Sequence, residues 1–141
     1  MQPFKWSKRH AVFIPEIDAQ HKDMFRLADQ LRQAVAGRAP ADRTRAVLRE
    51  FMTRGEDHFA HEERLMRSTQ YPGSAWHKRQ HDTARKRLKE FAPRIQGGEG
   101  QAALLLLEFL SGWLRDHIRL ADCMMAAHVR NCERAHAVRA S

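Results

Sequence analysis

Seven side chains of the kinds that bind transition metals are spaced along the chain in a pattern that suits one metal site. In two of the pairs that they form, the residues are four apart, so on a helix both side chains lie on one face, one turn apart. Imidazole and carboxylate ligands suit iron, and the lack of cysteine in the set argues against structural zinc or an iron–sulfur cluster. The predicted ligands are His21, His58, Glu62, His77, His81, His117 and Asp122.

Seven protein ligands are too many for one transition-metal ion and suit two octahedral ions. Each imidazole fills one coordination position, whereas a bridging carboxylate or a bridging oxo or hydroxo group fills one position on each ion. Five imidazoles, two bridging carboxylates and one such oxygen bridge therefore fill all positions of the two ions but one. One open position is what a reversible oxygen binder requires.

The pair His117 and Asp122 fits a regular helix poorly. The two residues are five apart, which turns them about 140° from each other around an ideal α-helix. Two explanations remain open. Either the aspartate reaches sideways to bridge two metals, or the helix contains a π-bulge, a feature that is frequent at functional sites.

Each histidine alone has an ordinary explanation, because a single His on an apolar helix stripe is most often a hydrogen-bonded core or boundary residue. The joint pattern favours ligands instead. All four inward stripes carry ligand-type residues, and burying them without a metal would leave polar groups unpaired at a cost on the order of several kcal/mol.

Apolar residues that recur every three or four positions predict four helices, separated by helix-breaking residues. Asp18 and Ser74 are candidate N-caps of the first and third helices, and Pro93 is a point at which the third could end or kink. The fourth helix is expected to continue past His128. The expected helix starts are Asp18, the segment Pro40 to Asp42, Ser74 and Gln101.

The predicted fold class is all-α, with an up-down-up-down four-helix bundle and an N-terminal arm. Short loops make neighbouring helices antiparallel, and 141 residues suit a single domain. The expected division is an arm over residues 1–17, the bundle over residues 18–128 and a C-terminal extension over residues 129–141.

The formal charge of +8 and the sequence pI of 10.3 raise the question of an anionic partner. Most residues of the densest basic cluster fall between inward positions of the third helix, which indicates a solvated helix face. No nucleic-acid-binding motif accompanies them, so no nucleic-acid partner is expected. The cluster comprises Lys78, Arg79, Arg85, Lys86, Arg87 and Lys89.

No apolar stretch is long enough to predict a membrane span, and the N-terminus does not resemble a signal peptide. Cys123 and Cys132 lie nine residues apart on one expected helix, about 13 Å along its axis, which exceeds disulfide reach. Reduced thiols favour the cytoplasm as the location.

Four stretches around the predicted ligands, with Trp6 upstream, resemble the bacterial hemerythrins. The resemblance spans about residues 4–122, and it implies a non-haem di-iron centre in a four-helix bundle, the architecture for which the myohemerythrin fold is a standard example. The stretches are Ile17 to Lys22, His58 to Glu63, His77 to His81 and Trp113 to Asp122.

The resemblance also implies roles for the ligands and for the oxygen pocket. His77, His81 and His117 would hold one iron, His21 and His58 would hold the other, and Glu62 and Asp122 would bridge them. Dioxygen would bind at the iron with two histidines. Leu114, with Phe51, Phe59 and Trp113 as further candidates, would close the pocket, although each of these four could equally be ordinary core.

Several residues depart from the family pattern or lie outside the ligand set. His10 and Phe13 suggest that the N-terminal arm packs differently, and Cys123-Met124-Met125 follows Asp122 where relatives have an aromatic residue. His128 is expected at an end of the bundle. Glu133 and His136 form a single Glu-x-x-His motif, whereas ferritin-like di-iron sites need two.

The predicted function is reversible dioxygen binding for storage, transport or delivery, to a recipient such as an oxygen-consuming enzyme, and not catalysis. Two alternatives remain: a di-iron redox enzyme with peroxidase or nitric-oxide chemistry, and an oxygen or redox sensor module. No acid–base pair near the open position is evident to favour an enzyme, and 141 residues leave no room for a fused signalling domain.

Overall fold

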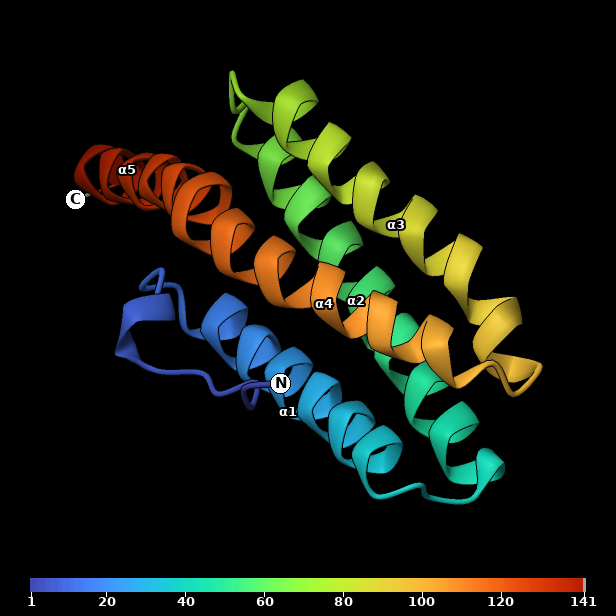
Figure 1. The fold of residues 1–141 in the computed structure, drawn as a ribbon. Helices are drawn as coiled ribbons and strands as arrows, with labels where there is room; N and C mark the ends of the chain where they lie inside the picture. Colours follow the sequence, from blue (N-terminus) through green and yellow to red (C-terminus); the bar gives the residue numbers. More distant parts are fainter. Residues whose placement is uncertain (141) are drawn as a thin grey trace.

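The computed structural model describes residues 1–140, and these residues form helices connected by short loops (Figure 1). Ser141, the last residue of the predicted extension, lies outside the described residues. No strand occurs within residues 1–140. In chain order the elements are the 3-10 turn η1 (Lys8–His10), α1 (Pro15–Ala36), α2 (Ala41–Ser68), α3 (Ser74–Gln96), α4 (Gly100–Asp116), the π-helical segment η2 (His117–Asp122) and α5 (Cys123–Ala140).

The helices form an all-α, up-down-up-down four-helix bundle, as predicted. Each of α1 to α4 packs against the helix before or after it in the chain, and α1 also packs against α4 and so closes the bundle. The segments α4, η2 and α5 follow one another without a loop and form one long rod whose end projects beyond the other helices (Figure 1). The N-terminal arm doubles back beside α1, and η1 contacts η2.

The apolar stripes of the sequence form the core. Large side chains from each bundle helix are almost completely buried, among them Leu31 of α1, Phe51 of α2 and Leu106 of α4. Burial of such side chains is worth about 1.5–3 kcal/mol each, which outweighs the modest helix propensities of the polar residues between them. The interior therefore contains both an apolar core and the cluster of predicted ligands.

The first helix begins earlier than predicted, and Asp18 is not its N-cap. Ile14 occupies the cap position and Pro15 the first turn, where a missing N–H costs no helical hydrogen bond. The Asp18 carboxylate instead accepts hydrogen bonds from the backbone N–H groups of Val12 (2.8 Å) and Phe13 (3.2 Å). These hydrogen bonds hold the N-terminal arm against α1 at Phe13, whose φ of 63° lies in the left-handed region.

One expectation about α3 also needs correction. Ser74 is the first residue of the helix, and Gly73 occupies the cap position. The Ser74 hydroxyl does not cap the helix; it donates a hydrogen bond to the Tyr71 carbonyl in the preceding loop, at 2.6 Å. Pro93 does not end the helix, which runs on to Gln96. Pro93 lies near the end of α3, where the loss of its N–H affects only the final part of the helix.

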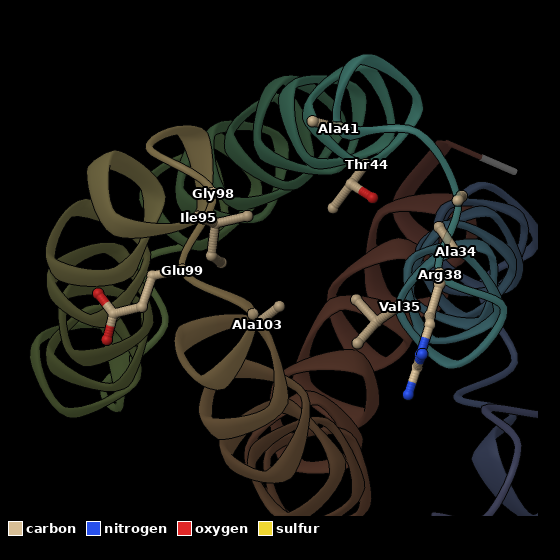
Figure 2. A pocket seen from close by; sticks show the side chains of 11 residues that line it. Ala34, Val35, Arg38, Ala41, Thr44, Ile95, Gly98, Glu99 and Ala103 are labelled. Carbon is tan, nitrogen blue, oxygen red and sulfur yellow. The ribbon is translucent and has the colours of Figure 1, made fainter.

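A hollow of about 270 Å³ lies at the loop end of the bundle, where α1 and α3 end and α2 and α4 begin (Figure 2). Its walls include Val35, Thr44, Ile95 and Ala103, and none of the seven predicted ligands lines it. Glu99 points away from the hollow, toward Arg94, which donates to it at 2.6 and 2.9 Å. The predicted chemistry therefore lies elsewhere in the bundle.

Candidate metal centre

All seven predicted ligands come together in the interior of the bundle. His21 comes from α1, His58 and Glu62 from α2, and His77 and His81 from α3. His117 and Asp122 are the two ends of η2. Their exposed fractions range from 0% to 4%, so no bulk water reaches these polar groups. Each of the four helical segments therefore contributes one residue or one pair of residues to a single buried cluster of polar side chains.

The ligand atoms divide into two overlapping groups, each compact enough to surround one metal ion. His77, His81 and His117 form one group and His21 and His58 form the other, while Glu62 and Asp122 belong to both. The side-chain donor atoms within each group all lie within 4.8 Å of one another. This arrangement matches two ions that share two carboxylates.

Each shared carboxylate turns one oxygen toward each group. Asp122 Oδ1 lies 3.0 Å from the Nε2 atoms of both His77 and His117, and its Oδ2 lies 3.0 Å from His21 Nε2. Glu62 Oε1 lies 3.0 Å from His81 Nε2, whereas its Oε2 lies 3.4 Å from His58 Nε2. Both side chains therefore have the orientation of a carboxylate that bridges two ions.

The π-helical segment resolves the poor spacing of His117 and Asp122. A π-turn bonds residues five apart, so the two ends of η2 lie above each other on one face, where an α-helix would turn them apart. Of the two explanations that the sequence left open, the π-bulge is the one that the structure contains. A regular α-helix over these residues would turn one of the two side chains away from the centre.

Several buried ligand atoms lie close to other ligand atoms without making good hydrogen bonds. Glu62 Oε2, His117 Nε2 and both Asp122 oxygens are buried and lack a hydrogen-bond partner of acceptable geometry among the described residues. Yet Asp122 Oδ1 and His117 Nε2 are only 3.0 Å apart. Buried polar atoms left without partners are groups that a bound cation would satisfy. The donor set, imidazoles and carboxylates without thiolate, fits iron.

The electrostatics of the site show how the ligands share protons in the absence of metal. Burial raises the pKa of Glu62 to about 8, and the nearby Asp122 carboxylate contributes to that rise. Burial lowers the pKa of His77, but the nearby Asp122 and Glu62 carboxylates outweigh it and raise the pKa to about 9. Burial opposes ionisation of Asp122, yet His117 and neighbouring imidazoles hold its pKa well below the usual range. Protons thus occupy part of the centre and must leave when metal binds.

His58 and His81 behave differently. Burial, followed by the nearby His21, lowers the pKa of His58, and burial, followed by His117 and His77, lowers the pKa of His81. Both rings are therefore neutral at pH 7, the protonation state in which an imidazole can bind a metal.

Three ligand imidazoles have a hydrogen-bond partner behind the ring, which the sequence alone did not reveal. The Nδ1–H of His58 donates to Gln20 Oε1 at 2.6 Å, that of His117 to Gln80 Oε1 at 2.7 Å, and that of His81 to Glu63 Oε2 at 2.9 Å. Such contacts fix the tautomer that presents Nε2 to a metal. The only sequence signal for them is a polar residue next to a predicted ligand, and that signal is too weak to use.

A small cavity, too tight to hold a water molecule, lies beside the centre and is lined by His21, His58 and His117. The predicted pocket residues Phe59, Trp113 and Leu114 line it, together with Met24 and Ile118, which were not among the predicted pocket residues. Phe51, the fourth predicted pocket residue, does not line it and is packed in the hydrophobic core. The cavity has an apolar wall facing the predicted ligands.

Two aromatic residues of that wall also stack on ligand rings. Trp113 lies parallel to His117, with centroids 4.3 Å apart and planes 11° from parallel. Phe59 stacks on His81, with centroids 4.1 Å apart and planes at 14°. These contacts restrict rotation of the imidazoles, so the apolar side chains help to hold the ligands in place.

The histidines and cysteines outside the ligand set have local roles or lie on the surface. His128 donates from Nε2 to the Thr69 carbonyl at 2.8 Å, at the end of α2, as expected for a residue at a bundle end. His10 packs on Phe25 with ring centroids 4.8 Å apart, and His136 is exposed. Cys123 and Cys132 are free thiols, as predicted.

Comparison with known proteins agrees with this geometry. The family description "Hemerythrin HHE cation binding domain" matches residues 12–129. The chain is 34% identical to a bacteriohemerythrin of Stenotrophomonas maltophilia over 135 residues, 93% of this chain and 87% of that protein. It is 35% identical to one of Pseudomonas aeruginosa, over 89% of this chain and 81% of that protein. It is also 30% identical to a hemerythrin of Siphonosoma cumanense, over 85% of this chain and 88% of that protein. The chain belongs to the hemerythrin family.

Proposed function

We propose that this protein binds dioxygen reversibly at a non-haem di-iron centre, for oxygen storage, transport or delivery. The observation that carries the proposal is the orientation of Glu62 and Asp122, each of which turns one oxygen to the three-histidine group and one to the two-histidine group. Membership of the hemerythrin family supports the same chemistry.

In this proposal the two groups of ligands hold one iron each. His77, His81 and His117 hold the first iron, and His21 and His58 hold the second. Glu62 and Asp122, which belong to both groups, would serve both ions. The iron pair, when bound, supplies the electrons that hold dioxygen.

The residues around the cavity keep the oxygen site dry. Met24, Phe59, Leu114 and Ile118 give it an apolar lining next to His21 and His58, the group with fewer imidazoles. Excluding water slows proton-assisted loss of the bound ligand and so favours release as dioxygen. Both imidazoles of the two-histidine group line the cavity, but only His117 of the three-histidine group does, which supports the two-histidine iron as the place where oxygen binds.

The titratable groups at the cavity support a carrier rather than an enzyme. Every ionisable side chain that lines it is one of the predicted ligands: His21, His58, His117 or Asp122. Cleavage of an oxygen–oxygen bond by general acid–base catalysis needs a free acid or base within hydrogen-bond reach. The described lining offers none.

The proposal also covers the location of the protein and the recipient of its oxygen. No described helix is both long and apolar enough to cross a membrane. The free, partly buried thiols of Cys123 and Cys132 suit the reducing cytoplasm, which we propose as the location. We propose an oxygen-consuming enzyme as the recipient of the oxygen.

Cycling between air and vacuum tests the function. Reduced, iron-loaded protein should gain a new absorption spectrum in air and return to the reduced spectrum under vacuum, with no peroxide formed. His58→Ala should abolish the change, and His136→Ala, which removes an exposed histidine outside the centre, should leave it intact. Irreversible oxidation of the parent, or turnover of added peroxide or nitric oxide, would instead indicate a redox enzyme.

A further inference from the structure

The five ligand imidazoles differ in what lies behind them. Behind His58 and His117 lie the neutral amide oxygens of Gln20 and Gln80, whereas behind His81 lies the carboxylate of Glu63. The Nδ1 atoms of His21 and His77 have no partner among the described residues. His81 is therefore the one ligand ring in the described part of the chain whose outer nitrogen faces a charged acceptor.

Glu63 is held in place by an arginine on the neighbouring helix. Arg85 Nη2 lies 2.8 Å from Glu63 Oε2, the same oxygen that accepts from His81. Arg85 also donates to both oxygens of Glu56 at 2.9 Å and, through Nη1, to Asp82 at 3.0 Å. Three carboxylates thus fix one guanidinium, and hydrogen bonds to Glu56 and Glu63 raise the pKa of Arg85, which stays charged.

Arg85 also packs over the aromatic ring that stacks on His81, which helps to hold its guanidinium beside Glu63. Its guanidinium carbon lies 5.2 Å from the centroid of the Phe59 ring, and Phe59 stacks on His81. Arg85 is 20% exposed and Glu63 12% exposed, whereas His81 is fully buried. The chain of contacts from Arg85 through Glu63 to His81 therefore runs from the surface to the metal centre.

The two charges act on the imidazole in opposite directions. A carboxylate that accepts the Nδ1–H bond draws that proton away and makes Nε2 a stronger electron donor to a metal than an amide acceptor does. A guanidinium on the same carboxylate oxygen withdraws negative charge and weakens this effect. A stronger donor stabilises the more highly charged ferric state.

We propose that Glu63 and Arg85 are positioning residues that together set the donor strength of His81 and, through it, the reduction potential of the iron pair. This inference rests on the proposed di-iron function. Glu63 lowers the potential and Arg85 limits how far it falls. The asymmetry between His81 and the amide-backed ligands is then a functional feature of the three-histidine side.

The test is a redox titration of iron-loaded protein, followed by absorption spectra, in which the two substitutions must act with opposite signs. Glu63→Gln, which gives His81 the amide partner that His58 and His117 have, should raise the potential. Arg85→Gln should lower it. We expect each to change the ratio of reduced to oxidised protein at fixed potential by about tenfold, comparable with the smaller effects that outer hydrogen-bond partners have on metal affinity.

Two controls separate this contact from long-range charge and from loss of structure. Glu56→Gln removes the same charge from the same arginine without touching His81, so it should leave the potential nearly unchanged. In the double variant Glu63→Gln/Arg85→Gln, the potential should equal that of Glu63→Gln alone, because Arg85 acts through Glu63. Thermal unfolding of each iron-free variant checks that the fold is retained.

Shifts of the same sign in Glu63→Gln and Arg85→Gln would overturn the inference, because simple loosening of His81 would move both potentials alike. An effect of Arg85→Gln that persists when Glu63→Gln is already present would overturn it too. A parent with two irons that does not release oxygen would contradict the carrier function alone, and the order of potentials would still decide the inference. A parent that cannot hold two irons would contradict both.

Discussion

His117 and Asp122 are five residues apart, yet His117 Nε2 lies 3.0 Å from Asp122 Oδ1, because the helix widens into a π-turn between them. The helical rod continues on both sides of this turn as α4 and α5. The π-segment therefore behaves as one extra residue accommodated locally, with the flanking helices still packed against the bundle.

Deletion of Leu120, which is 56% exposed, should therefore keep the metal centre. The deletion leaves His117 and Asp122 four apart, and in an ordinary α-helix they then share one face. The free energy of unfolding should change by about 1 kcal/mol or less, because a largely exposed residue is lost. Metal analysis should still find two irons per chain.

The control deletes exposed Glu108 of α4 instead. No local widening absorbs that change, so every following residue rotates by about 100° relative to the bundle and the ligands leave their places. Loss of iron in both deletions would show that the wide turn itself is needed for the bridge.

Glu62→Ala should lose both irons more readily than His21→Ala. Glu62 faces both groups of imidazoles, so its removal takes a ligand from each ion, whereas His21 belongs to one group. Iron release to a chelator, followed by absorbance, measures the difference. Glu90→Ala, a substitution of a surface glutamate, should behave as the parent. A normal oxygenated spectrum in Glu62→Ala would contradict the bridging role.

Leu114→Ala should speed autoxidation without loss of iron. Leu114 is buried and lines the cavity beside His21 and His58, so its truncation admits water to the oxygen site. The cavity left behind should also lower the free energy of unfolding by about 2–5 kcal/mol. Time-resolved spectra of the oxygenated protein give the decay rate.

Leu110→Ala is the matched control, because Leu110 lies one turn earlier in α4, is similarly buried, and does not line the cavity. It should cost similar stability and leave the decay rate unchanged. Equal decay in the Leu114 variant and the parent would mean that Leu114 is plain core.

The iron-free protein should lose stability as pH rises from 6.5 to 9. The pKa of His77 is raised from 6.5 to about 9, so its stabilising contribution is complete below pH 6.5 and is lost as pH rises through 9. Glu62 acts in the same direction. Its pKa is raised from 4.5 to about 8, so its stabilising contribution is complete below pH 4.5 and is lost as pH rises through 8. The total should be a few kcal/mol, at about 1.4 kcal/mol per unit of pKa difference.

Urea unfolding at several pH values between 6.5 and 9 measures this effect. Iron-loaded protein should show much less dependence on pH in this range, because metal replaces the protons of His77 and Glu62. A flat profile for the iron-free protein would contradict the assigned protonation.

The sequence predicted the bundle and the seven clustered residues because a helix converts spacing directly into a shared face. His77 and His81 can point only one way once Ala84 and Leu88 face the core. The π-turn could not be chosen over a sideways aspartate, because the choice depends on how α5 packs. Phe51 could not be assigned to the pocket or the core for a similar reason: the apolar stripe of α2 fixes that it is buried, not which apolar space it fills.

The partners behind the imidazoles also lay beyond the sequence. Gln20, Glu63 and Gln80 each reach a ligand on a different helix, so their contacts depend on how far apart the helices pack and on side-chain rotamers. Asp18 was misread because it can cap either a helix or an arm, and only the path of the arm decides which.

The most direct test of the central claim is the metal content of iron-replete protein, measured on the same sample as its absorption spectrum before and after air. Seven ligands that surround two points and share two carboxylates predict two irons per chain, with a spectrum that changes on oxygenation and reverts under vacuum. One metal ion per chain, or two zinc ions that iron cannot replace, would contradict the account.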